Sequence, residues 1–236
     1  MALNILLVHG AWGDGSNWSR VIPLLLSQGF HVTAVQNPLT SLADDVANTR
    51  RILGLQRGPT LLVGHSYGGA VITEAGNDSP LVTGLVYIAA FAPDAGEGLG
   101  DLLGRGQPPP GGANIYPDPD GFLWIKQEGF RESFAQDLGE MDARVLGVAQ
   151  RPIAGRCFSD KVTRPAWKVK PSWYQVSEQD RMIPPDTERF MAQRMRATTR
   201  SLPASHASLV SQPAEVSKLI LEAAASVEAG AGASVH

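Results

Sequence analysis

Ser66 is the central residue of Gly64-His65-Ser66-Tyr67-Gly68, which fits the pattern G-x-S-x-G. A serine in this pattern occupies a sharp strand-to-helix turn that exposes its hydroxyl, and the flanking glycines let strand and helix pass closely. The pattern alone is weak, but here an apolar run (residues 60–63) precedes it and a helix-like stretch (residues 70–75) follows it. The start of that helix offers N–H groups and a positive dipole to a developing negative charge. The sequence therefore predicts a nucleophilic serine.

A serine hydroxyl is a weak nucleophile near neutral pH, so it needs a base beside it. His206 follows the last predicted strand, in a loop that we expect to cross the carboxyl edge of a sheet. His65 adjoins the serine on the same turn and cannot easily fold back onto it, and we expect His9 to shape its own loop. The two remaining histidines lie at the start of a strand and in the C-terminal tail, so we predict that His206 is the base.

The imidazole of such a base needs a carboxylate that fixes its tautomer and stabilises its charged form. Asp180 lies in the loop after the strand predicted at residues 173–176, and Glu178 is the alternative two residues earlier. We favour Asp180 because it lies further out on the loop, where its carboxylate can reach His206. The other interpretation of Asp180 is a surface ion pair with Arg181, which would contribute little free energy.

Apolar runs alternate with helix-like stretches in both halves of the chain. The predicted strands cover residues 3–8, 31–35, 60–63, 85–90, 173–176 and 200–202. The predicted helices cover residues 17–28, 42–55, 70–75, 186–195 and 214–227. This alternation favours βαβ units, and therefore an α/β fold with a mostly parallel sheet and helices on both faces.

Residues 93–164 interrupt this pattern with many glycines and prolines, including Pro108-Pro109-Pro110-Gly111-Gly112. Structureless loops of this length are uncommon inside compact domains. We therefore predict an insertion with short helices near residues 122–134 and 140–148. The expected organisation is a core of residues 1–97 and 165–228, a cap insertion of residues 98–164 and a disordered tail of residues 229–236, which is rich in Gly, Ala and Ser.

The composition excludes several classes of protein. The 236 residues are 43% hydrophobic and 18% charged, as in globular proteins, and the net charge of −3 without a Lys/Arg run argues against a nucleic-acid partner. The single cysteine, Cys157, excludes an intrachain disulfide and a multi-cysteine metal site. No apolar run approaches the roughly 20 residues of a membrane span, and the N-terminus lacks the basic segment of a signal peptide. We therefore expect a soluble, cytoplasmic protein without a metal.

With serine, acid and base assigned, the chain resembles the α/β-hydrolase superfamily, and within it the carboxylesterases, plant methyl-ester esterases and hydroxynitrile lyases. The chain order Ser66, Asp180, His206 is that of the superfamily. The resemblance covers about residues 3–97 and 165–225. It is carried by Val8-His9-Gly10-Ala11-Trp12, Asn17-Trp18, Gly64-His65-Ser66-Tyr67-Gly68-Gly69, Glu178-Gln179-Asp180-Arg181 and Ser205-His206-Ala207.

The resemblance implies an oxyanion hole formed by the backbone N–H groups of Ala11 and Tyr67. It also implies that the inserted segment is a cap over the serine, which would bind the substrate and exclude water. Trp12 and Phe91 flank the predicted site, and Trp124 is the cap candidate for substrate binding. The aromatic residues of the cap could equally fill the cap's own small core.

The function implied by the resemblance is a serine esterase that cleaves small carboxylic esters through an acyl-enzyme, without a cofactor. Hydroxynitrile lyases of this type carry a hydroxyl residue where this chain has Gly10 and a lysine where it has Ala207, which argues against a lyase. The alternatives are a cofactor-free perhydrolase or haloperoxidase, a C–C hydrolase, and a small-molecule receptor on the same fold. The sequence leaves a homodimer open.

Overall fold

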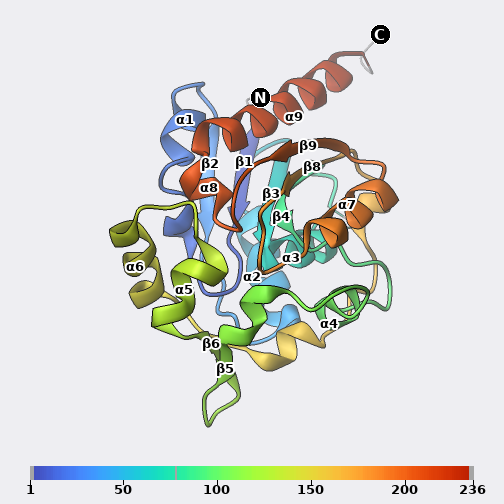
Figure 1. The fold of residues 1–236 in the computed structure, drawn as a ribbon. Helices are drawn as coiled ribbons and strands as arrows, with labels where there is room; N and C mark the ends of the chain where they lie inside the picture. Colours follow the sequence, from blue (N-terminus) through green and yellow to red (C-terminus); the bar gives the residue numbers. More distant parts are fainter. Residues whose placement is uncertain (1–2, 78, 234–236) are drawn as a thin grey trace.

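The computed structural model describes residues 3–77 and 79–233, and within them six strands form one parallel sheet (Figure 1). The order across the sheet is β2-β1-β3-β4-β8-β9, so the chain starts near the middle and reaches both edges. This confirms the predicted α/β fold with a mostly parallel sheet. The strands are β1 (Asn4–Val8), β2 (His31–Val35), β3 (Thr60–Ser66), β4 (Val82–Ala90), β8 (Ser172–Ser177) and β9 (Thr198–Leu202).

The central strands are mostly apolar because both of their faces are covered. All residues of β1 and β3 are buried, and all but one residue of β4. The edge strand β9 is mostly exposed and correspondingly polar, with the sequence TTRSL. This distribution is the one expected of a parallel sheet packed between two layers of helices.

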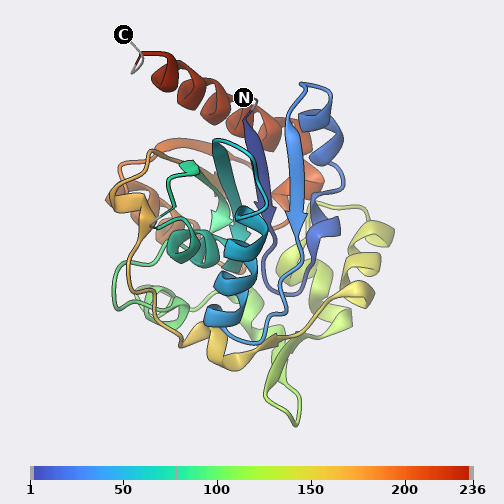
Figure 2. The same cartoon turned by 180° about the vertical axis from the view of Figure 1, so that it is seen from behind.

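Helices cover both faces of the sheet. Helices α2 (Leu42–Leu53) and α3 (Tyr67–Ala75) pack together on the face seen in Figure 2. Helices α1 (Ile22–Leu26), α8 (Ser208–Ser211) and α9 (Pro213–Ala233) lie on the face seen in Figure 1. Helix α7 (Pro185–Arg194) packs against β8.

The helix predicted at residues 17–28 is divided into two shorter pieces. A 3-10 turn, Gly15–Trp18, comes first, and the Asp14 side chain caps its start. Helix α1 follows with Pro23 in its first turn, where a proline is tolerated because that N–H has no partner inside the helix. The single helix predicted there was therefore wrong, because Pro23 fits the start of a helix but not its interior.

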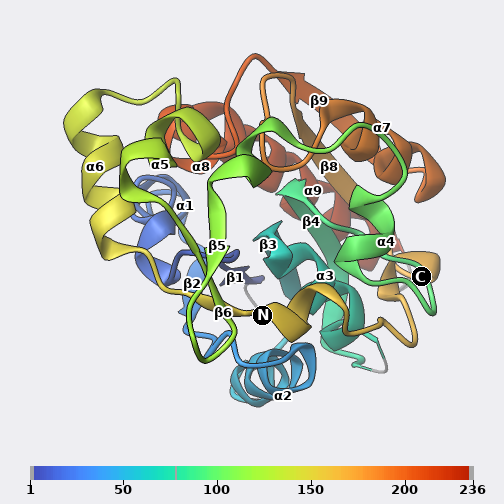
Figure 3. The same ribbon diagram turned by 60° about the horizontal axis from the view of Figure 1, so that its bottom comes forward.

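The inserted segment lies across the edge at which the parallel strands end (Figure 3). Its helices are α4 (Leu99–Leu103), α5 (Gln127–Phe134) and α6 (Glu140–Ala149). It also contains an antiparallel sheet of β5 (Ile115–Pro117), β6 (Phe122–Ile125) and β7 (Ile153–Ala154). Short 3-10 turns cover Pro110–Asn114, Gly155–Phe158 and, just after the segment, Ala166–Lys168.

The helix expected from residue 122 was therefore wrong for its first four residues, which form strand β6. Aromatic and β-branched residues favour a strand there. Asp118 closes the preceding turn, because its carboxylate accepts hydrogen bonds from the backbone N–H groups of Asp120 and Phe122. The helix begins only at Gln127.

Helix α9 runs to Ala233 and so includes residues 229–233 of the predicted disordered tail. Alanine is the strongest helix former, which explains the continuation beyond the buried part of the helix. The end of the predicted tail, residues 234–236, lies outside the described residues. Within residues 3–77 and 79–233, no helix combines the length and the hydropathy that crossing a bilayer requires.

Candidate active site

Ser66 occupies a strained turn between β3 and α3. Its φ of 52° and ψ of −125° lie in a region that residues with a side chain seldom adopt. The turn is tight: a Cβ on Gly64 would lie 2.6 Å from the Gly68 carbonyl oxygen, and a Cβ on Gly68 would lie 2.5 Å from the Val8 carbonyl oxygen. The two glycines of the pentapeptide are therefore required by close backbone contacts, as the motif predicted.

Ser66, His206 and Asp180 form one chain of hydrogen bonds from three distant segments. His206 Nε2 lies 2.8 Å from Ser66 Oγ, and His206 Nδ1 lies 2.5 Å from Asp180 Oδ2. The other carboxylate oxygen of Asp180 accepts the N–H groups of Met182 at 2.6 Å and Ile183 at 2.9 Å. All three predicted side chains are buried, so the structure brings them together in one site shielded from solvent.

Glu178, the alternative carboxylate, and Arg181, the alternative partner of Asp180, both form ion pairs with other residues. Glu178 pairs with Arg189 at the surface. Arg181 pairs with Glu132 of the inserted segment at 3.3 Å, not with Asp180. The carboxylate that faces His206 is therefore that of Asp180.

His9 is fully buried and orients the loop after β1. Its Nε2 accepts the Asn37 N–H at 3.0 Å, and its Nδ1 therefore carries the proton and donates to the Gly10 carbonyl at 2.9 Å. Burial lowers the pKa of His9 to about 4, so the ring is neutral near pH 7. Since N–H and C=O point in opposite directions in a trans peptide, this bond sets the direction of the Ala11 N–H.

The N–H groups of Ala11 and Tyr67 are free to act as donors next to the serine. Both residues are buried and line the same cavity as Ser66, and neither N–H donates to another group in the described part of the chain. The loop is pressed against the serine, because a Cβ on Gly10 would lie 2.6 Å from Ser66 Cβ. The geometry is compatible with the predicted oxyanion hole.

The side chain of Tyr67 is anchored to α2. Its hydroxyl donates to Asp45 Oδ2 at 2.6 Å, while Asp45 Oδ1 accepts the Leu39 N–H at 2.8 Å. Burial raises the pKa of Asp45 to about 6. This buried carboxyl fixes the first residue of α3, whose N–H is the second candidate oxyanion donor.

The cavity above Ser66 is small and apolar. Its free space is about 30 Å³, which is the room of a single water molecule. An ester must therefore displace cap side chains when it binds. The lining residues are Ala11, Trp12, Ser66, Tyr67, Phe91, Leu99, Leu103, Pro109, Ile115, Phe158, Met182 and Ile183.

Two of the three predicted substrate-binding residues, Trp12 and Phe91, line this cavity. Trp124 lies outside it, because its indole N–H donates to Asp118 Oδ2 at 2.9 Å within the β5–β6 hairpin. Met182 and Ile183 also line the cavity, and no sequence motif identified them. Their position directly after Asp180 was the available signal, since apolar residues that follow a site carboxylate lie at the same sheet edge.

The inserted segment contacts both His206 and the loop after β1 (residues 9–12), which we call the oxyanion loop. The indole of Trp12 donates to the Leu123 carbonyl of β6 at 2.9 Å. The Phe134 ring at the end of α5 packs edge-on against the His206 ring, with centroids 4.7 Å apart. The predicted cap position over the serine therefore agrees with these contacts.

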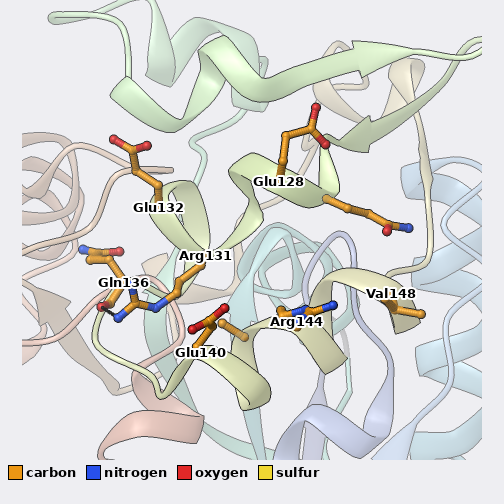
Figure 4. A pocket seen from close by; sticks show the side chains of 9 residues that line it. Glu128, Arg131, Glu132, Gln136, Glu140, Arg144 and Val148 are labelled. Atoms are coloured by element: carbon orange, nitrogen blue, oxygen red, sulfur yellow. Dashed lines mark hydrogen bonds between the residues drawn. The ribbon is translucent and has the colours of Figure 1, made fainter.

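A larger hollow lies between α5 and α6 and is unrelated to Ser66 (Figure 4). Its volume is about 770 Å³, and charged side chains such as Arg131, Glu132, Glu140 and Arg144 surround it. Ser66, His206 and Asp180 do not line this hollow. Residues 3–77 and 79–233 contain no cluster of three His, Cys, Asp or Glu side chains that could hold a metal ion.

Comparison with known proteins identifies two relatives whose names describe hydrolytic enzymes. The chain is 27% identical to the pyrethroid hydrolase of Sphingobium wenxiniae, and the match covers 93% of this chain and 86% of the relative. It is 35% identical over 119 residues to the carbendazim hydrolyzing esterase of a Nocardioides species, a match that spans about half of each protein, 45% of this chain and 49% of the relative.

Solved structures extend the likeness to the whole fold. The crystal structure of a pyrethroid hydrolase from Sphingobium faniae matches with a TM-score of 0.83 and 25% identity, covering 95% of this chain and 98% of that one. A model of the alpha/beta hydrolase family matches residues 5–219. The chain therefore belongs to the alpha/beta hydrolase family.

Proposed function

We propose that this α/β hydrolase is a carboxylic ester hydrolase that cleaves small esters through an acyl-enzyme on Ser66. The observation that carries the proposal is the chain of hydrogen bonds from Ser66 through His206 to Asp180, at 2.8 and 2.5 Å. Family membership and relatives named as an esterase and a pyrethroid hydrolase support ester hydrolysis.

In the first half of the reaction, Ser66 Oγ attacks the ester carbonyl carbon while His206 Nε2 takes its proton. Asp180 stabilises the imidazolium that forms, through its bond to Nδ1. The Ala11 and Tyr67 N–H groups hold the oxyanion, and one such donor contributes roughly 2.7–4 kcal/mol to transition-state stabilisation in other hydrolases. His206 then protonates the departing alcohol, which leaves the acyl group on Ser66.

In the second half, a water molecule attacks the acyl carbon and His206 takes its proton. The same two N–H groups hold the second oxyanion, and Ser66 regains its proton from His206 as the acid departs. The buried cavity excludes other water from the acyl-enzyme, which strengthens the electrostatic stabilisation in the site. His65 and His9 stay neutral throughout because burial lowers their pKa values to about 3 and about 4.

The cavity lining points to an uncharged, apolar ester. Apart from Ser66 and the two candidate N–H donors, the lining offers aliphatic, aromatic and thioether groups, such as Phe91, Leu99 and Met182. A charged acyl group would lose its hydration there without a partner. The small free space favours a short acyl chain, because such a chain displaces the fewest cap side chains.

The test compares the wild type with Ser66→Ala in hydrolysis of p-nitrophenyl acetate and butyrate, with the exposed Ser27→Ala as the matched control. We expect Ser66→Ala to lose the activity, Ser27→Ala to retain it, and a fluorophosphonate to label Ser66 in the wild type. Equal rates in wild type and Ser66→Ala would remove Ser66 from the mechanism.

Two further assays address the alternatives from the sequence. Peroxide-dependent halide oxidation that exceeds ester turnover would favour a perhydrolase or haloperoxidase, and tight small-molecule binding without turnover would favour a receptor. No feature of the site favours either over an esterase. The cytoplasmic location, a homodimer and the division into core and cap at residues 98 and 164 stay predictions.

A further inference from the structure

Glu188 is a fully buried carboxyl that the mechanism above does not use. It lies on α7, the helix that follows the Asp180 loop. Its Oε2 accepts the Ser177 N–H at the end of β8, at 2.9 Å. Its Oε1 is also buried and has no donor to accept from within the described residues. An ionised carboxylate at this position would leave one charged oxygen without a partner, which is costly in a buried site.

The neighbour of Glu188 is a second carboxyl, that of Asp180. Burial raises the pKa of Glu188 well above its usual range, and the negative charge of Asp180 raises it further. Two neighbouring buried carboxyls cannot both ionise at low cost, which favours one of them keeping its proton.

Charges on the surrounding elements favour the proton on Glu188. Asp180 accepts two backbone N–H groups and the His206 ring, all of which stabilise its ionised form. Glu178, before Asp180 in the loop, adds further negative charge near Glu188. From β8, Tyr174 offers a neutral phenol whose hydroxyl donates to the Ala90 carbonyl. The adjacent Arg189 pairs with Glu178 and Asp186 at the surface.

We propose that Glu188 stays protonated and donates a hydrogen bond from Oε1 to the Asp180 carboxylate, as a positioning residue for the Asp180–His206 pair. This proposal rests on the proposed function for its effect on catalysis. Donating this proton gives the buried Oε1 of Glu188 a hydrogen-bond partner. It also gives the Asp180 carboxylate a fourth hydrogen bond, in addition to those from Met182, Ile183 and His206, and a carboxylate has room for about four. The proton remains on Glu188 and takes part in no transfer.

An infrared measurement tests the protonation without any substrate. At neutral pH we expect the wild type to show the carbonyl band of a buried, protonated carboxylic acid, and Glu188→Gln to lack it. Asp45→Asn is the control, because it removes another buried carboxyl whose pKa is about 6, and it should keep the band at neutral pH. A spectrum in which Glu188→Gln changes only carboxylate bands would overturn the proposal.

Kinetics test the role. Glutamine has a similar shape, accepts the Ser177 N–H and donates permanently to Asp180, so Glu188→Gln should match the wild type in kcat, KM and the acid limb of kcat/KM. Glu188→Leu lacks the donor and should lower kcat by about tenfold with little change in KM. A fall of about one pH unit in the acid-limb midpoint of Glu188→Gln would show that Glu188 was ionised and would contradict the proposal.

Equal kcat in Glu188→Leu and Glu188→Gln would likewise contradict a donor role. If Glu188→Leu does not fold, as judged by its thermal unfolding, the infrared band and the acid limb of Glu188→Gln decide alone. If the wild type hydrolyses no ester, the infrared result still decides the protonation, so failure of the proposed function and failure of this proposal are distinguishable.

Discussion

The ring of His65, the residue before the predicted nucleophile, donates a hydrogen bond from Nε2 to the backbone carbonyl of His206, at 2.8 Å. The two rings also lie in contact, with centroids 4.8 Å apart. His65 is fully buried, and burial lowers its pKa to about 3, so it is a neutral donor near pH 7. The turn that presents Ser66 therefore also holds the backbone of the residue that faces it.

Replacing His65 with leucine should lower kcat for p-nitrophenyl butyrate by about tenfold and destabilise the fold by about 1–3 kcal/mol, because the buried His206 carbonyl would lose its donor. The exposed His31 provides the control, His31→Leu, which should change neither quantity. Steady-state kinetics and urea unfolding measure the two effects. An unchanged kcat would mean that the His65 contact does not position His206.

Two buried neutral histidines should make the fold sensitive to acid. Burial lowers the pKa values of His9 and His65 from 6.5 to about 4 and about 3. The unfolded state therefore binds more protons, so their contribution to stability is complete above pH 6.5 and is lost as the pH falls toward those folded values. Each histidine adds roughly 1.4 kcal/mol of slope per pH unit in this window.

Urea unfolding at a series of pH values, on the wild type and on His65→Gln, measures that slope. Glutamine retains a donor without a titrating ring, so the variant should lose the His65 share of the slope. Identical slopes in the two proteins would show that His65 does not titrate between the folded and unfolded states.

Asp45 should act in the opposite direction. Burial raises its pKa from 3.8 to about 6, so its contribution to stability is complete below pH 3.8 and is lost as the pH rises through about 6. In Asp45→Asn the amide oxygen can still accept the Leu39 N–H, the amide NH2 can donate to the Tyr67 hydroxyl oxygen, and the side chain cannot ionise. The stability of this variant relative to the wild type should therefore increase by roughly 2 kcal/mol between pH 4 and pH 7. Parallel stability curves over this range would contradict the prediction.

Gly10→Ala should lower kcat by about a hundredfold while the protein stays folded, because the new Cβ would lie 2.6 Å from Ser66 Cβ and must push the oxyanion loop away from the serine. Gly139→Ala is the matched control, since a Cβ there meets no atom within 4 Å. Kinetics and circular dichroism on both variants test this. Similar kcat values in the two variants would exclude a tight contact between the loop and Ser66.

The cap residue Leu103 limits the space above Ser66. Leu103→Ala should raise kcat/KM for a butyrate ester relative to an acetate ester by about tenfold, because the cavity gains the volume of the removed methyl groups. Leu55→Ala is the control, because that side chain is 67% exposed and lies outside the cavity. A ratio unchanged from the wild type would show that Leu103 does not contact the acyl chain.

The sequence by itself determined the features that depend on local backbone chemistry. Glycines two residues on either side of Ser66 predicted its turn, and the structure shows that Gly64 and Gly68 have no room for a side chain. Continuous apolar runs predicted the parallel strands, because a strand covered on both faces has no polar side. In a parallel sheet these strands end at one edge, so Asp180 and His206 could be assigned to that edge with Ser66.

Only the tertiary structure decided which side chains meet across the chain. Phe134 contacts His206, and Trp124 turns away to Asp118, although both are aromatic residues of the same insertion. The sequence around Glu188 is typical of an exposed helix position, yet in the structure α7 buries this side chain near Asp180. Local patterns cannot reveal such contacts, because burial, charge pairing and the free space above Ser66 depend on how segments far apart in sequence pack together.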